Sequence, residues 1–467
     1  MDPRRLPRLV FSALLLGALG LAAAPVSVSD ASESPSRQDE KASGGMMTRS
    51  ADPVVIKGKE FPSMKGLGLD GFRLFVFSRG QWQPVPFQID EMDGDGFYVL
   101  PSGKRPNKDT GKGERAGELD DDDELVFMVS DVGEKAPSGR GQGGLGERCA
   151  AEIEVRDPST GAKGWAYLLW FEHPPAPSPT DYVRFDPRQD RVFAQAYTLG
   201  YSPAKDLVYT TYMAIPHSGS GADLTDASLL DRVNIRFTAS IFLKSITFSR
   251  NEDDFVSEVI AYKDGPVRVM RRVANSMRLA LGVQSPKIIA YSVYYRDSIE
   301  TPNTMHLPVG LGSVAKSIYF EGGSDYTHNA FGMQFYCSED TRGFLADGRM
   351  SPQERSLEQA EHEWTVMSGP QGTIMSRVEM GQGLKGVLGK RLIYIDDLER
   401  SNAPEDEPGT TPKIGFALTN ILALKKGTYY YNVHFYFLPS YVPGREKPYL
   451  DIIDHPVEVR VQGLGSS

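Results

Sequence analysis

Cysteine is scarce in this chain, which has only Cys149 and Cys337 among 467 residues. A small fold held together by several disulfides is therefore excluded, and so is a zinc site built from four cysteines. In an oxidising compartment the two thiols could form one disulfide, or they could remain separate and buried. The sequence leaves both alternatives open.

Several catalytic motifs are also missing. The sequence contains no HExxH, no GxSxG, no P-loop and no dinucleotide-binding fingerprint after a strand. The glycine-rich segment GRGQGGLG lacks the strand and helix that a phosphate-binding loop requires. The familiar zinc peptidase, serine hydrolase and nucleotide-binding classes are therefore not indicated.

Positive charge is in deficit. The chain has 51 Lys and Arg against 61 Asp and Glu, a net charge of −10, and no run rich in Lys and Arg stands out. Because phosphate neutralisation supplies most of the affinity for nucleic acids, nucleic acid is not an expected partner.

The N-terminus has the features of a secretory signal peptide. Arg4, Arg5 and Arg8 precede an apolar run over residues 9–21, which is followed by three alanines. That run is too short to span a bilayer of about 30 Å. We therefore expect residues 1–24 to be removed on export to the periplasm or the medium, with no transmembrane segment in the mature chain. Their removal would change the net charge from −10 to −12.

Glycine, proline and aromatic residues are abundant, with 47 Gly, 32 Pro, 22 Phe and 21 Tyr. Alternating and aromatic runs, such as residues 72–77, 124–129, 232–243 and 428–437, recur between turn signals and predict β-strands. Residues 352–362 and 274–281 are the two stretches that resemble helices. The expected fold class is all-β, an antiparallel β-sandwich or super-sandwich with a smaller N-terminal β domain.

Changes in composition predict the domain organisation. Residues 25–51 have the composition of a flexible leader, and residues 52–171 form the expected N-terminal β domain with acidic loops. Residues 172–181 include four prolines and read as a stiff linker. Residues 182–467 are then the larger β-sandwich domain.

Two acidic segments are the clearest candidates for a metal site, because Ca²⁺ takes six to eight oxygen ligands. The EF-hand register fails in the first segment, since Ser102 stands where a glutamate is required. A different kind of Ca²⁺ loop and ordinary solvated turns between strands remain as alternatives. The candidate ligands are Asp90, Glu91, Asp93, Asp95, Asp120, Asp121, Asp122 and Asp123.

A second group of residues has the chemistry of a catalytic site. A polysaccharide lyase needs a base beside a sugar carboxylate and a cation to neutralise that carboxylate. The candidates, expected in loops on either side of a strand, are His306, His328, Tyr326 and Arg296. Four tyrosines after the linker either line a sugar-binding face or belong to buried strands. These are Tyr197, Tyr201, Tyr209 and Tyr212.

Three fragments together carry a resemblance to a known group. They are PVPFQID at residues 84–90, DDDELVF at 121–127 and DGPVR at 264–268. Their arrangement resembles uncharacterised exported bacterial β-sandwich proteins, which are similar to the galactose-mutarotase-like super-sandwich group. The resemblance implies the fold class and export, and it points function toward carbohydrate. It supplies no set of catalytic residues.

The sequence therefore predicts an exported binding protein for a glycan (a polysaccharide) or a partner protein of the cell envelope, stabilised by Ca²⁺ if the acidic loops bind it. One alternative is a carbohydrate-active enzyme, either a polysaccharide lyase or a glycoside hydrolase. Another alternative is a structural component of an envelope assembly.

Overall fold

The structure is a computed structural model. It describes residues 47, 49–94, 96–108, 116–137, 145–201, 210–215, 228–241, 247–278, 287–358, 360–400 and 410–464. The predicted signal peptide and most of the predicted leader lie outside these residues. The described chain forms two compact units, each treated by itself below.

The first unit, here called the N-terminal unit, is built from three separate segments. These are the described residues of 26–184, 263–269 and 444–467. The chain thus returns to this unit twice after leaving it, and both returning segments fall within the predicted larger domain. Strand pairing explains the second return, because the last strand pairs along its whole length with a strand near residue 150.

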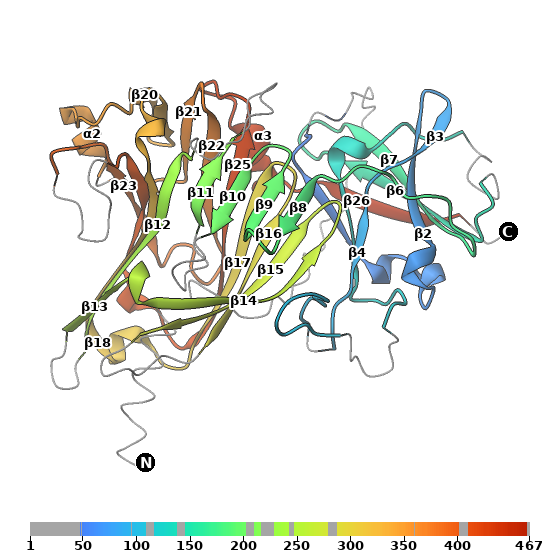
Figure 1. Ribbon diagram of the computed structural model, residues 1–467, viewed down its shortest axis with the longest axis horizontal. Coiled ribbons are helices and arrows are strands. Elements are labelled where there is room, and N and C mark those ends of the chain that lie inside the picture. The colour runs from blue at the N-terminus through green and yellow to red at the C-terminus, as the bar shows by residue number, and fades with distance from the viewer. Residues whose placement is uncertain are drawn as a thin grey trace, which may run out of the picture. The chain divides into compact units, whose positions relative to one another are not determined.

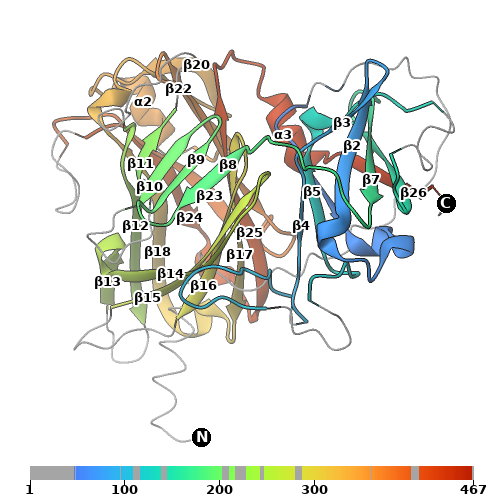
Figure 2. The ribbon, with the colours of Figure 1, turned by 45° about the vertical axis from the view of Figure 1, so that its right-hand side comes forward.

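Two antiparallel sheets make up the N-terminal unit (Figures 1 and 2). The three-stranded sheet has the order β1 (Pro53–Lys57), β5 (Glu124–Met128) and β4 (Gln88–Asp90). The five-stranded sheet has the order β26 (Glu458–Gly463), β6 (Cys149–Arg156), β7 (Lys163–Trp170), β2 (Phe72–Ser78) and β3 (Gln81–Pro84).

The core of the N-terminal unit draws buried aliphatic and aromatic side chains from both sheets. Ile56 and Phe127 of the smaller sheet belong to the same buried cluster as Leu74, Ile153 and Leu168 of the larger one. Such a two-layer packing is the solution expected for sheets that are apolar on one face.

The second unit, here called the sandwich unit, comprises the described residues of 185–262 and 270–443. Its five-stranded sheet has the order β13 (Thr247–Asn251), β12 (Leu230–Ile241), β18 (Ala315–Tyr326), β24 (Lys413–Thr419) and β23 (Gly389–Ile395). A four-stranded sheet has the order β11 (Thr210–Ala214), β10 (Thr198–Tyr201), β9 (Arg191–Ala194) and β8 (Val183–Asp186).

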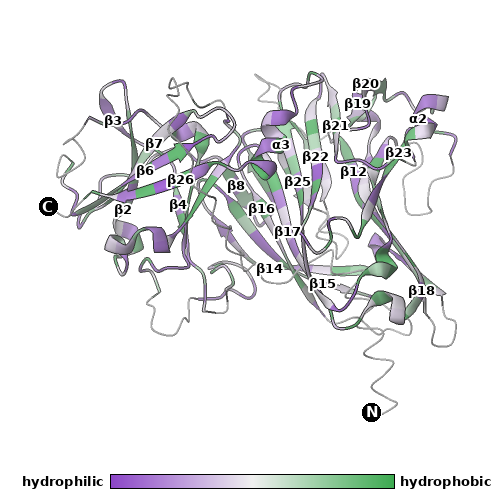
Figure 3. Cartoon of the chain, turned by 180° about the vertical axis from the view of Figure 1, so that it is seen from behind, coloured by the Kyte–Doolittle hydropathy of each residue, from purple (hydrophilic) through white to green (hydrophobic). Residues whose placement is uncertain are grey.

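A nine-stranded sheet completes the sandwich unit. Its order is β14 (Phe255–Asp264), β15 (Val269–Met277), β16 (Ile288–Tyr294), β17 (Ser298–Leu307), β25 (Gly427–Leu438), β22 (Gly372–Met380), β21 (Trp364–Gly369), β19 (Gln334–Cys337) and β20 (Asp340–Leu345). Figure 1 shows the five-stranded and nine-stranded sheets facing each other, and Figure 3 shows hydropathy changing along their strands. The predicted all-β sandwich class is confirmed.

Helices are few in the described part of the chain. The prediction of a helix at 352–362 is confirmed over α2 (Pro352–Leu357), which begins with a capping box between Ser351 and Glu354. A second helix, α3, spans Lys447–Asp454. None of the helices in the described residues is both long enough and apolar enough to cross a membrane.

The expected helix at 274–281 is wrong where the structure describes it. Strand β15 continues to Met277, and residues 279–281 lie outside the described chain. Eight residues are too few to distinguish helical from strand periodicity, and pairing within the nine-stranded sheet decides the outcome.

Candidate functional site

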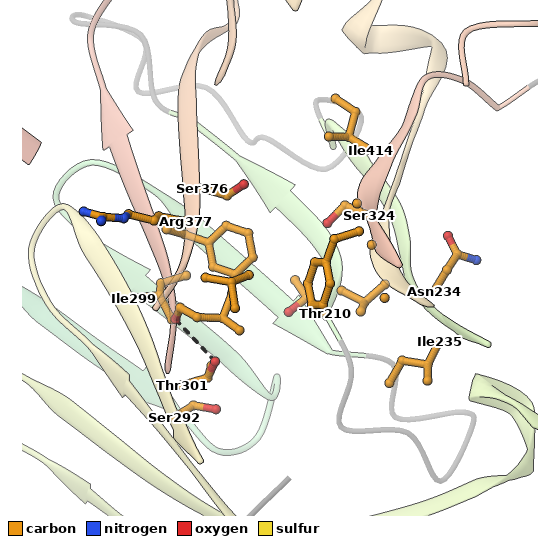
Figure 4. Close-up of a pocket in the computed structure, with 18 of the residues that line it drawn as sticks. Thr210, Asn234, Ile235, Ser292, Ile299, Thr301, Ser324, Ser376, Arg377 and Ile414 are labelled. Carbon is orange, nitrogen blue, oxygen red and sulfur yellow. Dashed lines mark hydrogen bonds between the residues drawn. The ribbon is translucent and has the colours of Figure 1, made fainter. Parts of the chain in front are cut away.

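A cavity of about 300 Å³ lies in the sandwich unit, between the five-stranded and nine-stranded sheets. Aliphatic and aromatic side chains form most of its lining. Figure 4 shows polar side chains of both sheets around this apolar interior. Those labelled there from the nine-stranded sheet are Ser292, Thr301, Ser376 and Arg377, and those from the five-stranded sheet are Asn234 and Ser324.

Strand register shows how the nine-stranded sheet builds one wall. Tyr294, Ile299, Phe435, Ser376 and Thr365 are successive cross-strand partners on β16, β17, β25, β22 and β21, and all five line the cavity. With neighbouring strands about 4.8 Å apart, this row is about 19 Å long. The wall therefore suits an elongated molecule.

Alternation along β18 builds the opposite wall. Phe320, Gly322, Ser324 and Tyr326 occupy every second position and line the cavity. A Cβ atom added at Gly322 would meet its nearest neighbour at 3.7 Å, so this glycine leaves usable space. The size of the cavity thus depends partly on a missing side chain.

One end of the cavity is bordered by two buried tyrosines. The hydroxyls of Tyr201 on β10 and Tyr294 on β16 share a hydrogen bond. Arg271 on β15 donates from Nη1 to the Tyr294 oxygen at 3.3 Å and pairs through Nη2 with Asp190 at 2.6 Å. Burial raises the pKa of Tyr201 well above its usual value, and the neighbouring Tyr294 raises it further. The Tyr201 hydroxyl therefore remains protonated at neutral pH.

His362 supplies another polar group to the lining. Its side chain is buried, and its Nδ1 atom has no hydrogen-bond partner among the described residues. Burial, assisted by the nearby Lys390, lowers the pKa of His362 to about 4. Burial and Arg377 also lower the pKa of Lys390, to about 8. His362 is therefore neutral at pH 7 and offers a hydrogen-bond acceptor.

The structure does not bring the four predicted catalytic side chains together. His306 lies in β17, not in the expected loop, and its exposed ring contacts the Thr428 hydroxyl at 3.0 Å. Arg296 precedes the other end of that strand, about 30 Å away at strand spacing, and pairs with Asp297 at 2.8 Å. The geometry therefore gives no support to joint catalysis by His306 and Arg296.

The other two candidates lie at the end of β18 and just after it. Tyr326 ends β18, is buried and lines the cavity, and burial raises its pKa. His328 begins a short 3₁₀ turn and is exposed. Only Tyr326 of the predicted catalytic residues therefore belongs to the cavity.

The first acidic segment mostly accepts hydrogen bonds from its own unit. Asp93 accepts from the Phe97 N–H at 2.9 Å and from Asn107 at 3.1 Å, while Glu91 accepts from the Gly117 N–H at 2.6 Å. Asp95 lies outside the described residues. These hydrogen bonds order the loops around the first acidic segment.

The second acidic segment contacts the first. Buried Asp123 accepts from the Met92 N–H at 3.1 Å and from the Asp120 N–H at 3.0 Å. Burial raises the pKa of Asp123 to about 7, with help from the nearby charges of Asp120 and Glu91.

Asp121 pairs with Lys65, and Asp122 is exposed. Among the residues that the structure describes, no group of three His, Cys, Asp or Glu side chains could hold a metal ion. With Asp95 undescribed, Ca²⁺ binding stays a prediction.

Asp90 belongs to a buried ionic cluster in the N-terminal unit. Arg268 donates from Nε to Asp90 and from Nη2 to Glu124, both at 2.7 Å. Lys263 pairs with Asp90 at 2.7 Å, and Lys57 pairs with Glu124 at 3.0 Å. Asp90 is thus paired with two cations in this structure.

The three fragments that carry the resemblance meet at this cluster. The Gln88 side-chain oxygen accepts from the backbone N–H groups of Val267 and Arg268, at 3.1 and 2.9 Å. A Cβ atom on Gly265 would lie 2.4 Å from that same oxygen, so a side chain there would displace the Gln88 amide from its hydrogen bonds. The fragments therefore have a structural role in the N-terminal unit.

The structure also bears on the predictions for the two cysteines and the four tyrosines. Both cysteines are free thiols, Cys337 buried and Cys149 partly exposed. Tyr197, Tyr201 and Tyr212 are buried in the sandwich unit, as the strand interpretation predicted, and Tyr209 lies outside the described residues. These tyrosines form no exposed sugar-binding face.

Sequence reasoning missed the cavity because its lining comes from many strands far apart in the chain. One local signal was present. Gly322 and Gly323 stand inside the strand sequence SIYFEGGSDY, and glycine inside a strand often marks a close approach or an open space. Gly323 illustrates the close approach, since a Cβ there would lie 2.6 Å from the Ile414 carbonyl oxygen.

Comparisons with known proteins assign this chain to no family. No protein-family model matches it, and no curated protein does. An alpha-mannosidase from Enterococcus faecalis V583 aligns with 88% of this chain and 44% of its own length, with 8% identity and a TM-score of 0.42. A glycosyl hydrolase family 38 protein from Enterococcus faecalis aligns with 88% of this chain and 49% of its own length, with 8% identity and a TM-score of 0.41.

A third solved structure, of a Synechocystis sp. PCC 6803 protein, aligns with 56% of this chain and 97% of its own length, with 9% identity and a TM-score of 0.30. This chain spans less than half of the length of each Enterococcus structure. Likeness at this level transfers no activity, so the all-β assignment rests on the sheets themselves.

Proposed function

We propose that this protein is an exported binding protein that encloses a small, mainly apolar ligand between the sheets of its sandwich unit. The observation that supports the proposal is the cavity of about 300 Å³ with its largely aliphatic and aromatic lining. Ligand pockets in proteins typically begin at about this volume and combine an apolar lining with a few polar groups.

The lining also limits the affinity. A ligand that buries about ten carbon atoms gains about 8 kcal/mol at about 0.8 kcal/mol per carbon, which corresponds to a Kd of about 1 μM. The loss of translational freedom on binding weakens that value. We therefore expect micromolar or weaker binding of simple apolar probes.

A free glycan fits this lining less well than an apolar molecule does. Each sugar hydroxyl that leaves water needs a hydrogen-bond partner, and the lining includes the apolar side chains of Ile299, Val433, Phe435 and Phe416. A glycan or a partner protein would have to bind elsewhere on the chain. Either would be compatible with an exported protein, and the experiment below includes the glycan.

The test uses the mature protein, residues 25–467, and pentylbenzene followed by saturation-transfer NMR. Gly322→Leu fills the cavity from β18, where an added Cβ atom meets no neighbour closer than 3.7 Å. Ser317→Leu adds the same side chain to an exposed position of that strand and serves as the matched control.

We expect wild type and Ser317→Leu to bind pentylbenzene equally, and Gly322→Leu to bind it at least tenfold more weakly. Equal binding by Gly322→Leu would contradict the cavity as the site. Absence of pentylbenzene binding, together with binding of oligosaccharides from a panel, would replace the proposal with the glycan prediction.

A further inference from the structure

The two tyrosines at the end of the cavity have one hydroxyl proton more than their hydrogen bonds use. Both side chains are nearly fully buried, with Tyr201 7% and Tyr294 2% exposed, and both line the cavity. Each phenol can donate one hydrogen bond. Their single mutual bond uses one of the two protons.

The contact with Arg271 does not use the second hydroxyl proton. A guanidinium only donates, so its bond to Tyr294 occupies an acceptor position on that oxygen and takes no proton. Among the described residues, no other group accepts a hydrogen bond from Tyr201 or Tyr294. A buried donor left unsatisfied costs free energy, so the second O–H is a ready partner for an acceptor inside the cavity.

The arginine also holds the pair in place. Its guanidinium carbon lies 3.8 Å from the centre of the Tyr201 ring and 5.0 Å from that of Phe185. Arg271, Val273 and Asn275 alternate along β15, which directs Arg271 to the cavity side of the sheet. The pair is therefore preorganised, with little freedom to turn its donor elsewhere.

We propose that the ligand of this cavity presents a neutral carbonyl oxygen to the Tyr201–Tyr294 pair, while its apolar body lies along the wall between Tyr294 and Thr365. This inference rests on the proposed function, because it names the chemistry recognised at the same site.

The charge balance favours a neutral acceptor over an anion. Asp190 already neutralises Arg271 through their contact of 2.6 Å. A carboxylate entering the cavity would lose its hydration and, among the residues that the structure describes, would find no uncompensated cation beside the two phenols. A ketone, ester or amide oxygen accepts the same hydrogen bond at a smaller desolvation cost.

The experiment compares two probes of nearly equal shape. Butyl phenyl ketone carries a carbonyl where pentylbenzene carries a methylene. The ratio of their Kd values is measured for wild type, for the double variant Tyr201→Phe/Tyr294→Phe, and for Tyr394→Phe. Tyr394 is equally buried in the sandwich unit but lies outside the cavity lining, so it is the matched control. Comparing ratios cancels the different solubilities of the two probes.

We expect the double variant to raise the ratio of ketone Kd to hydrocarbon Kd about tenfold, the effect of one lost hydrogen bond. Tyr394→Phe should leave the ratio unchanged. An unchanged ratio in the double variant would overturn the carbonyl proposal and leave the apolar site intact. Pentylbenzene binding that survives in the double variant also shows that the variant is folded.

Phenylpentanoate tests the preference for a neutral oxygen. At pH 7 it should bind at least tenfold more weakly than the ketone. Tighter binding of this carboxylate would overturn the neutral acceptor in favour of an anion. If neither the ketone nor pentylbenzene binds wild type, the proposed function itself fails, which is a different result from an unchanged ratio.

Discussion

Replacing Arg268 by methionine tests the buried ionic cluster of the N-terminal unit. The side chains of Arg268, Asp90 and Glu124 are at most 3% exposed, so the two carboxylates cannot turn to water when the arginine is removed. Removing one partner from a buried ion pair typically costs about 3–5 kcal/mol. Lys263 and Lys57 still pair with one carboxylate each, so we expect the lower end, about 3 kcal/mol of unfolding free energy.

Urea unfolding followed by tryptophan fluorescence measures this loss. Trp82, Trp165 and Trp170 lie in the N-terminal unit and Trp364 in the sandwich unit, so the signal reports mainly on the unit that changes. Arg156→Met is the matched control, because Arg156 and Glu458 form an exposed pair. Exposed pairs contribute at most about 1 kcal/mol. A loss below about 1 kcal/mol for Arg268→Met would refute the reasoning.

Acid titration gives an independent check of the same cluster. Burial would raise the pKa of Asp90 and of Glu124, but Lys263, Arg268 and Lys57 outweigh burial and hold both pKa values below their ordinary range. Stability from these carboxylates is therefore present above their unfolded pKa and is lost as the pH falls through the folded value. Without Arg268 the folded pKa values rise, so the variant should lose stability at a higher pH than wild type.

Three further predictions concern other side chains. The folded pKa of about 7 at Asp123 means that the unfolding free energy falls as the pH rises from about 4 to about 7. Urea titrations should show a smaller fall in Asp123→Asn than in wild type. An equal fall would contradict the raised pKa. The calcium prediction expects a clearly higher melting temperature in millimolar Ca²⁺ than in EDTA, and coincident melts would contradict it. Ellman's reagent should label Cys149 in the native protein and Cys337 only after unfolding, because burial also raises the pKa of Cys337, and two unreactive thiols that appear only on reduction would instead indicate a disulfide.

Much of the fold could be predicted because strand periodicity is local. The aromatic run at 428–437 falls inside β25, and the run at 72–77 falls inside β2. Strand β17 (Ser298–Leu307) was missed, since it is polar and carries Pro302 in the middle of a sheet, where proline is rare. Its omission also placed His306 in a loop.

The cavity could not be predicted in the same way. Tyr201 and Tyr294 are 93 residues apart, and neither has a neighbour in sequence that marks it as functional. Their meeting depends on how β10 and β16 pack, which is a property of the assembled sheets. The three fragments that carry the resemblance also meet in space. The sequence alone did not show that Asp90 joins a cluster of buried charges, because this depends on the positions of Lys263 and Arg268.

The pairing of β26 with β6 has a consequence for how the chain is made. Arg156 and Glu458, which pair across these two strands, are separated by 302 residues, so the partner of β6 leaves the ribosome only after the whole sandwich unit. Until then β6 is an open sheet edge, and open edges recruit other strands. The nascent protein therefore needs to be kept from associating through β6 during synthesis, and the pairing with β26 ends that period of exposure.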